Sequence, residues 1–180
     1  TSFLRLVPHQ EAPTAICWGD RNRSVLVRVP LGWQNIDDSM FRDANPAEPA
    51  IDELPNDSQT VELRSPDGSA AVHLLLAGIA VAARIGLTEP GMADYARERK
   101  VDGDASQTPD LDQLPGSCFE AAGRLLTQRE DYEAKGVFPA GLIDSWASRL
   151  VALGDVHLRD DLADSRISVE ELVERYFHIG

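Results

Sequence analysis

The chain has 180 residues, of which 43% are apolar and 26% charged, and it carries a net charge of −13. This composition is typical of a globular domain with a core of its own. The negative charge argues against general nucleic-acid binding, because phosphates repel such a surface. A function with anionic substrates would therefore require arginines that are concentrated in one place.

The two cysteines, Cys17 and Cys118, lie about a hundred residues apart, and the sequence contains no CxxC motif. This spacing argues against a thiolate metal site. We expect two reduced cysteines in the core of a cytoplasmic protein, with a disulfide between them as the alternative.

The first 33 residues combine strand-forming sequence with a local excess of arginine, since they hold four arginines and only two acids. The segments "AICWG" and "SVLVRVP" are rich in β-branched and aromatic residues. They predict strands within residues 12–30, with "DRN" as the turn between them. Alternation places Val25, Val27 and Val29 on one face of the second strand and Arg28 on the other.

Residues 34–59 hold seven acids, one arginine and three prolines without a hydrophobic period, which predicts an acidic insertion. The segment "TVELRSP" then returns to strand character and predicts a further strand at about 60–65. Glu62 and Arg64 lie two positions apart in it and so share a face. We expect these strands to pair in an antiparallel sheet.

The segment from residue 68 onward has a helical pattern. The apolar stretch "AAVHLLLAGIAVAARIGL" predicts a helix that lies buried inside the domain and is capped by Asp67 or Ser69. His73, in the same helix, is expected to be a buried histidine with a hydrogen-bond partner rather than a metal ligand. The sequences "SCFE" and "SVEE" are capping boxes that predict further helix starts. The predicted helices cover about 69–86, 89–99, 117–134 and 142–151, with a last one after 168.

Strands that come first and helices that follow predict an α+β fold rather than alternating strands and helices. We treat residues 1–180 as a single partial domain, with the insertion at 34–59 and a mainly helical part at 68–180.

Seven charged residues are candidates for a site, and several occupy strand positions opposite a row of apolar side chains. Arginine pairs with carboxylate and phosphate oxygens through two parallel hydrogen bonds, and glutamate oxygens suit Mg²⁺ or Mn²⁺. The alternative is that these charges form solvated pairs on the faces of the strands. The candidates are Arg5, Glu11, Arg21, Arg23, Arg28, Glu62 and Arg64.

The order of three motifs, "RLVPHQEAP", "DRNRSVLVRVP" and "VELRSPDGSA", resembles the second half of the glutamine synthetase catalytic domain. Further along the chain, "LPGSCFEA", "REDYEAKGVF" and "LIDSWAS" are similar to the helical region of that family. The resemblance covers residues 1–34 and about 60–153. It implies a ligase of nitrogen metabolism that uses ATP to join glutamate and ammonia, forming glutamine through a γ-glutamyl phosphate intermediate. ATP as co-substrate and Mg²⁺ or Mn²⁺ as cofactor are implied with it.

The resemblance also implies roles for the candidates that would meet glutamate. Arg5 would bind the carboxylate of the substrate, and Arg64 would steady the γ-carboxylate and its phosphorylated form. Glu11 would lie on a loop that closes over the site, where it would help ammonium to lose a proton. The family has Gly-Tyr before this glutamate, whereas this chain has His9 and Gln10. That departure leaves the amine substrate open.

The remaining candidates would meet the nucleotide and the metal. Arg23 and Arg28 would face the ATP phosphates, with Arg23 also counted as catalytic, and Glu62 would ligate a metal ion. Arg21 is a weaker candidate at the edge of the nucleotide pocket. A full metal site needs several carboxylates, and this sequence offers one convincing candidate.

We therefore expect the 180 residues to be a fragment of a longer polypeptide, inactive alone, whose parent is a cytoplasmic homo-oligomer that binds neither nucleic acid nor membranes. Two other functions stay open. One is a glutamate–amine ligase of the γ-glutamyl polyamine type, and the other is a non-catalytic nucleotide-binding or regulatory protein of the same fold.

Overall fold

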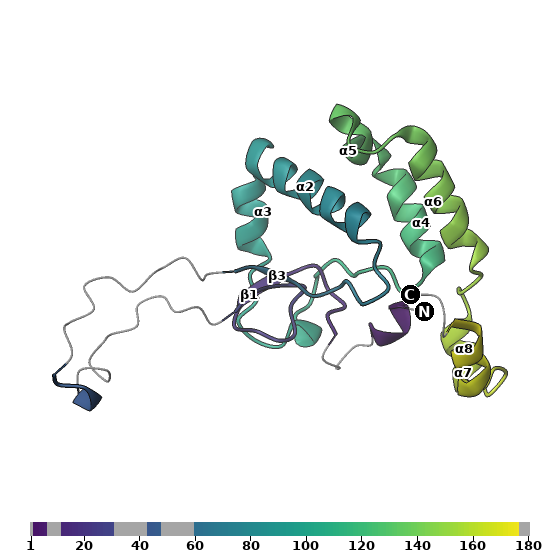
Figure 1. The fold of residues 1–180 in the computed structure, drawn as a ribbon, viewed down its shortest axis with the longest axis horizontal. Helices are drawn as coiled ribbons and strands as arrows, with labels where there is room; N and C mark the ends of the chain where they lie inside the picture. The colour runs from purple at the N-terminus through teal and green to yellow at the C-terminus, as the bar shows by residue number, and fades with distance from the viewer. Residues whose placement is uncertain (1, 7–11, 31–42, 48–59, 177–180) are drawn as a thin grey trace.

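The structure is a computed structural model that describes residues 2–6, 12–30, 43–47 and 60–176. A small sheet packs beside a helical block, and a short 3-10 helix, η1 (Ser2–Arg5), lies near the helical block (Figure 1). This arrangement confirms the predicted α+β class. The predicted acidic insertion at 34–59 falls largely outside the described residues.

The sheet has three short strands in the order β1 (Trp18–Asp20), β2 (Val27–Val29) and β3 (Glu62–Leu63). Strands β2 and β3 are antiparallel, as predicted, with Arg28 opposite Glu62. Strands β1 and β2 are parallel, so the expected antiparallel pairing is wrong for this pair.

The parallel pairing of β1 and β2 follows from the path of the loop at 21–26. Asn22 donates from Nδ2 to the carbonyl oxygens of Val101 (3.0 Å) and Gly103 (2.7 Å). Ser24 Oγ accepts from the amide of Ala105 at 2.9 Å. These bonds hold the loop against a distant segment, so the chain returns to the starting end of β1 before it forms β2 instead of reversing in a tight turn.

The helical block begins with α2 (Val72–Thr88) and α3 (Met92–Glu98), which confirms two of the predicted helices. Neither expected cap acts on α2, because its N-cap is Ala71 without a side-chain hydrogen bond. Asp67 Oδ1 instead accepts from the backbone amide of Ser69 (2.9 Å) and from its hydroxyl (2.6 Å).

The rest of the block consists of the 3-10 turn η3 (Ala105–Gln107), α4 (Cys118–Thr127), α5 (Arg129–Glu133), η4 (Ala134–Gly136), α6 (Ala140–Ala152), α7 (Leu158–Ala163) and α8 (Val169–Tyr176). The single helix predicted at 117–134 is divided, because α4 ends before Gln128. Lys135 has a φ of 61° inside η4 and turns the chain toward α6. Helix α7 was not predicted.

In the part of the chain that the structure describes, two clusters of buried side chains form the core. One lies against the sheet and contains Ala15, Cys17, Val25, Val101 and Ala105. The other lies within the helical block, where Val81, Phe138 and Ile143 are buried together.

The two cysteines are buried and free, as expected. Burial raises the pKa of both thiols, that of Cys118 to about 11. They are therefore protonated at neutral pH and behave as small apolar side chains.

The expected burial of α2 is wrong. Val81 is its one buried residue, and His73 is exposed in its first turn. Leu76 and Leu87 keep 58% and 87% of their surface exposed. The reason is that α2 is apolar on all sides, whereas the described part of the chain packs against one side of it.

Within the described residues, no single helix has the length and apolar composition needed to cross a membrane. Helices α2 and α3 meet that requirement only as a pair, and the pair is bent by 107°.

Candidate functional site

The pairing of β2 with β3 places Arg28 directly against Glu62. Arg28 Nε donates to Glu62 Oε2 at 2.7 Å, and its Nη2 lies 2.5 Å from the same oxygen. The two side chains keep 24% and 41% of their surface exposed. They therefore form a charge-assisted pair that solvent and small ligands can reach.

Arg64 lies beside this pair and is less exposed than either member, at 14%. Its Nη1 donates to the carbonyl oxygens of Arg23 and of Val25, the latter at 3.2 Å. Its Nε lies 4.0 Å from Glu62 Oε1, at the limit of an ion pair. Arg64 thus connects the carboxylate to the backbone of the loop that carries Arg23.

Arg23 is exposed between two residues that fix the loop. Asn22 and Ser24 bind the segment 101–105 on either side of it, and Ser24 also donates to Asn22 Oδ1 at 2.8 Å. The predicted site did not include these two residues. The available signal was the pair of short polar side chains that flank the arginine in "RNRS", since such side chains commonly bond to nearby backbone.

Gly19 in β1 brings the same segment close to the sheet. A Cβ atom at this position would overlap the carbonyl oxygen of Val101. The lack of a side chain therefore allows 101–103 to lie directly on β1, where Val101 donates its amide to Trp18 O at 2.9 Å.

Arg5 reaches the same region from η1. It donates from Nη1 to Ser65 O (2.6 Å) and Pro66 O (3.3 Å), and from Nη2 to Arg64 O (3.1 Å). The side chain remains exposed while it holds the backbone that follows β3.

The remaining two candidates are Arg21 and Glu11. Arg21 is exposed at the end of β1 with a φ of 54°, and its amide bonds to Val29 O at 2.7 Å. Among the described residues, no hydrogen bond or ion pair joins its side chain to the Arg28–Glu62 pair. Glu11, with His9 and Gln10, lies outside the residues that the structure describes. The structure thus brings together the side chains of Arg28, Glu62 and Arg64, and it joins Arg5 and Arg23 to them through hydrogen bonds with backbone carbonyls. These five residues form the charged cluster.

The cluster contains one carboxylate, Glu62, which already accepts from Arg28. Among the described residues there is no group of three or more His, Cys, Asp or Glu side chains that could hold a metal ion. Mg²⁺ requires about six oxygen ligands in an octahedral arrangement. The described residues by themselves therefore do not fit a complete metal site.

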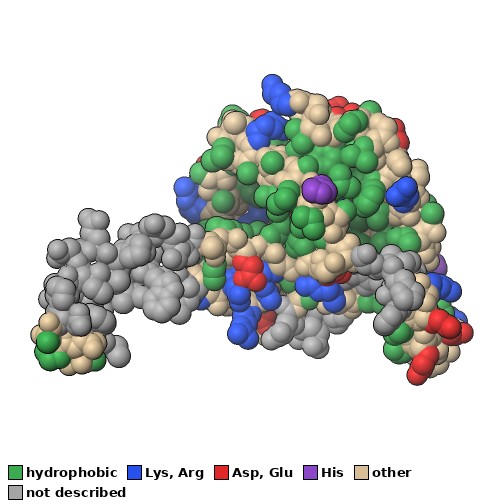
Figure 2. Space-filling model, in the orientation of Figure 1, with side chains coloured by type: hydrophobic (Ala, Val, Ile, Leu, Met, Phe, Trp, Pro, Cys, Tyr) green, Lys and Arg blue, Asp and Glu red, His purple; other side chains and the backbone are tan. Residues whose placement is uncertain are grey.

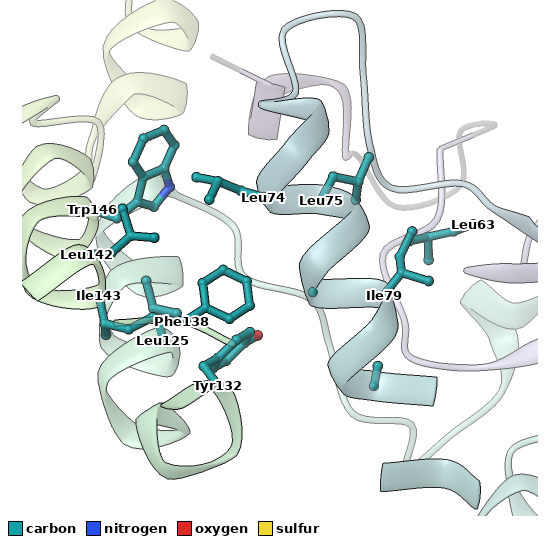
Figure 3. Close-up of a pocket in the computed structure, with 12 residues that line it drawn as sticks. Leu63, Leu74, Leu75, Ile79, Leu125, Tyr132, Phe138, Leu142, Ile143 and Trp146 are labelled. Carbon is teal, nitrogen blue, oxygen red and sulfur yellow. The ribbon is translucent and has the colours of Figure 1, made fainter. Parts of the chain in front are cut away.

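An apolar pocket lies on the other side of β3. The strand alternates, so Glu62 belongs to the charged cluster while Leu63 lines this pocket of about 310 Å³. Leu74 and Ile79 of α2 line the same pocket, opposite Trp146 of α6 and Phe138 just before that helix (Figure 3). Figure 2 shows hydrophobic side chains gathered over the helices, with charged side chains of both signs below them. This apolar pocket offers no charged group for a polar substrate.

The sequence that forms this charged cluster matches known proteins. Residues 1–149 match the family model described as the catalytic domain of glutamine synthetase. The chain belongs to the glutamine synthetase family. The match covers all five of the clustered charged residues and ends within α6, so α7 and α8 lie beyond it.

The chain is also similar in sequence to individual glutamine synthetases. That of Pyrococcus abyssi is 34% identical over 187 residues, which cover 99% of this chain and 36% of that protein. That of Thermococcus kodakarensis is 31% identical over 185 residues, with the same shares. The Salmonella typhimurium enzyme is 28% identical over 146 residues, or 81% of this chain and 27% of that protein. The chain thus spans about a third of the length of these glutamine synthetases.

Proposed function

We propose that this chain supplies part of the active site of an ATP-dependent glutamate–ammonia ligase, which forms glutamine through γ-glutamyl phosphate. One observation carries the proposal. In a chain that belongs to the glutamine synthetase family, Arg28 and Glu62 come from two motifs far apart in the sequence and pair directly, with Arg64 beside them. Arg5, from the third motif, binds the backbone carbonyls that follow Glu62.

The proposed role of Arg28 and Arg23 is to neutralise phosphate charge, the principal requirement of phosphoryl transfer. Arg28 uses Nε and Nη2 toward Glu62, and a guanidinium has five N–H donors. It therefore keeps donors for a phosphate oxygen without releasing Glu62. Arg23 is exposed on a loop fixed at both sides, so its charge is presented at low entropic cost.

Arg5, Arg64 and Glu11 are proposed to act on glutamate and ammonium. Arg5 is exposed beside β3 and is assigned to the substrate carboxylate. Arg64 lies within reach of Glu62 and is assigned to the γ-carboxylate, although its Nη1 also holds the 23–25 backbone. Glu11 is assigned to ammonium on the basis of its motif alone.

Glu62 is proposed as a single ligand of Mg²⁺ or Mn²⁺, with the other ligands supplied from outside the described residues. Because the whole sequence offers only this one convincing carboxylate ligand, the proposal includes that the 180-residue chain alone does not turn over. The measurement is phosphate release from ATP with glutamate, ammonia and Mg²⁺. Robust turnover by the isolated chain would overturn this part of the proposal.

The function itself is tested in a chimera. The matched segment of the Pyrococcus abyssi glutamine synthetase is replaced by this chain, which aligns with it over 99% of its residues. We expect phosphate release that depends on glutamate, ammonia and ATP together. Arg28→Met should lower kcat at least ~100-fold, because a transition-state charge contact is lost. The matched control is Arg97→Met, which removes an exposed arginine paired with Asp94 three residues earlier in α3.

The same chimera separates the alternatives. A glutamate–amine ligase, suggested by His9 and Gln10, would be active with a polyamine in place of ammonia. A non-catalytic nucleotide-binding protein would bind ATP in a magnesium-dependent manner without turnover. We further propose that the complete protein is a cytoplasmic homo-oligomer. Light scattering of the chimera would test the oligomeric state.

A further inference from the structure

Arg159 of α7 forms side-chain hydrogen bonds that span most of the chain. Its Nη2 donates to Phe3 O at 2.5 Å and to Leu6 O at 2.7 Å, at sequence separations of 156 and 153. These carbonyl oxygens lie in η1 and directly after it. The carbonyls at the end of a helical turn carry partial negative charge, which a cation satisfies well. Phe3 O thus accepts from Arg159 in addition to the Leu6 amide.

The turn held by Arg159 is the one that carries Arg5. While Arg159 binds the backbone of η1 from one side, the guanidinium of Arg5 binds the carbonyls of residues 64–66 on the other. These carbonyls directly follow Glu62 and Leu63 of β3. The turn η1 therefore bridges α7 and the charged cluster, consistent with its place in Figure 1.

Arg159 is itself presented from a fixed segment. Leu158 beside it is buried, with 6% of its surface exposed. Asp155 is also buried, and its carboxylate accepts from the amides of Cys118 (2.7 Å) and Phe119 (3.3 Å) at the start of α4. The contacts run from α4 through Asp155 and Leu158 to Arg159, and from there to η1 and Arg5.

We propose that Arg159 is a positioning residue for Arg5, and that through it the C-terminal segment beyond the family-model match sets the orientation of the substrate-binding arginine. The assignment of Arg5 to glutamate rests on the proposed function, whereas the positioning of Arg5 by Arg159 does not. Lysine has enough donors for both carbonyls, but its ammonium is a compact, strongly hydrated charge on a flexible stem, so it should hold them less rigidly and replace arginine only in part.

The positioning is tested on the 180-residue chain by NMR with ¹⁵N labelling. In the wild type we expect hindered rotation of the Arg5 guanidinium and a protected amide at Leu6, which donates to Phe3 O at 3.1 Å. Arg159→Met should abolish the hindered rotation and speed exchange of the Leu6 amide at least tenfold, while amides of α6 stay unchanged. Arg159→Lys should give intermediate values, so the test does not depend on the folding of the methionine variant.

The control is Arg166→Met, which removes an exposed arginine paired with Asp161 and Asp164 beside the same helix. It should leave the signals of Arg5 and Leu6 unchanged. Wild-type behaviour of these signals in both Arg159 variants would overturn the proposal.

The effect of Arg159 on substrate binding is measured as KM in the chimera. Arg159→Met should raise KM for glutamate at least fivefold and leave KM for ATP within twofold. An equal rise in both constants would show a general structural defect and count against the positioning of Arg5. A chimera without any glutamate-dependent activity would contradict the proposed function, and the NMR experiment would still decide the role of Arg159.

Discussion

The Asp155→Asn substitution should destabilise the protein by weakening the hydrogen bonds that hold the start of α4. Asp155 keeps 8% of its surface exposed, and its carboxylate accepts two backbone hydrogen bonds from the first turn of α4, at 2.7 Å and 3.3 Å. Asparagine has nearly the same shape but only one accepting oxygen and no charge. One amide in the first turn of α4 would then face an NH₂ group.

The magnitude follows from these two bonds. A hydrogen bond to a charged group contributes about 1.5 to 3 kcal/mol, and a negative charge at a helix N-terminus adds about 0.3 to 1 kcal/mol. The shorter bond survives as a neutral one and the longer bond is lost, so we expect a loss of about 2 to 3 kcal/mol. For a chain of this size that corresponds to a decrease in Tm of about 4 to 12 °C.

The assay is urea unfolding followed by circular dichroism, with Tm as a second measurement. The control is Asp160→Asn, which neutralises an exposed carboxylate five residues further on, in α7. It should change the free energy of unfolding by less than about 0.5 kcal/mol. If Asp155→Asn changed it by as little as the control, the two hydrogen bonds of this carboxylate would not stabilise the start of α4.

Three further predictions concern other parts of the fold. Gly19→Ala should lower the free energy of unfolding by about 1 to 3 kcal/mol, because its Cβ would overlap Val101 O and force backbone to move; thermal unfolding checks this, and an unchanged Tm would contradict it. Burial raises the pKa of the Cys118 thiol from 9.0 to about 11, so its contribution to stability, up to about 3 kcal/mol, is fully present below pH 9 and lost as the pH rises through 11. Urea titrations from pH 8 to 11.5 measure this, and a Cys118→Ala variant with the same alkaline slope as the wild type would refute it. Hydrogen bonds from Ser168 lower the pKa of Glu171. The capping of α8 should therefore be complete above the ordinary pKa range of glutamate and weaken as the pH falls through the lowered pKa, which amide exchange in α8 would measure. Glu171→Gln should remove this pH dependence of amide exchange.

Local features of the fold were predictable because the sequence contains both partners within a few positions. Both capping boxes are present, with Ser117 Oγ accepting from the Glu120 amide and Ser168 Oγ from the Glu171 amide, each at 3.1 Å. Even here one detail differs, since Glu120 bonds to the amide of Gly116 rather than to that of the cap residue.

Features that depend on distant partners were not predictable in this way. Asp155 reaches α4 across 37 residues of sequence, and no local pattern marks that contact. The predicted burial of α2 was wrong because apolar composition indicates what a helix prefers to bury, and not whether neighbours exist to cover it. The parallel pairing of β1 and β2 is set in the same way by contacts with residues 101–105.

The candidate site was partly predictable. Alternation along a strand placed Glu62 and Arg64 on one face, where Arg64 Nε lies 4.0 Å from Glu62 Oε1. The stronger partner, Arg28, requires the register between β2 and β3, which a single sequence does not give. The catalytic and binding roles of these residues stay predictions.

The attachment of the 21–26 loop to residues 101–105 has a consequence for the order of folding. Asn22 bonds to Val101 and Gly103 across 79 and 81 positions of sequence. Forming these contacts closes a long loop and costs much chain entropy, so they should form late in folding. Helices α4 and α6 pack together within a span of about 35 residues and can associate much earlier. Refolding should therefore proceed in two kinetic stages, with the helical hairpin forming first and the charged cluster maturing last.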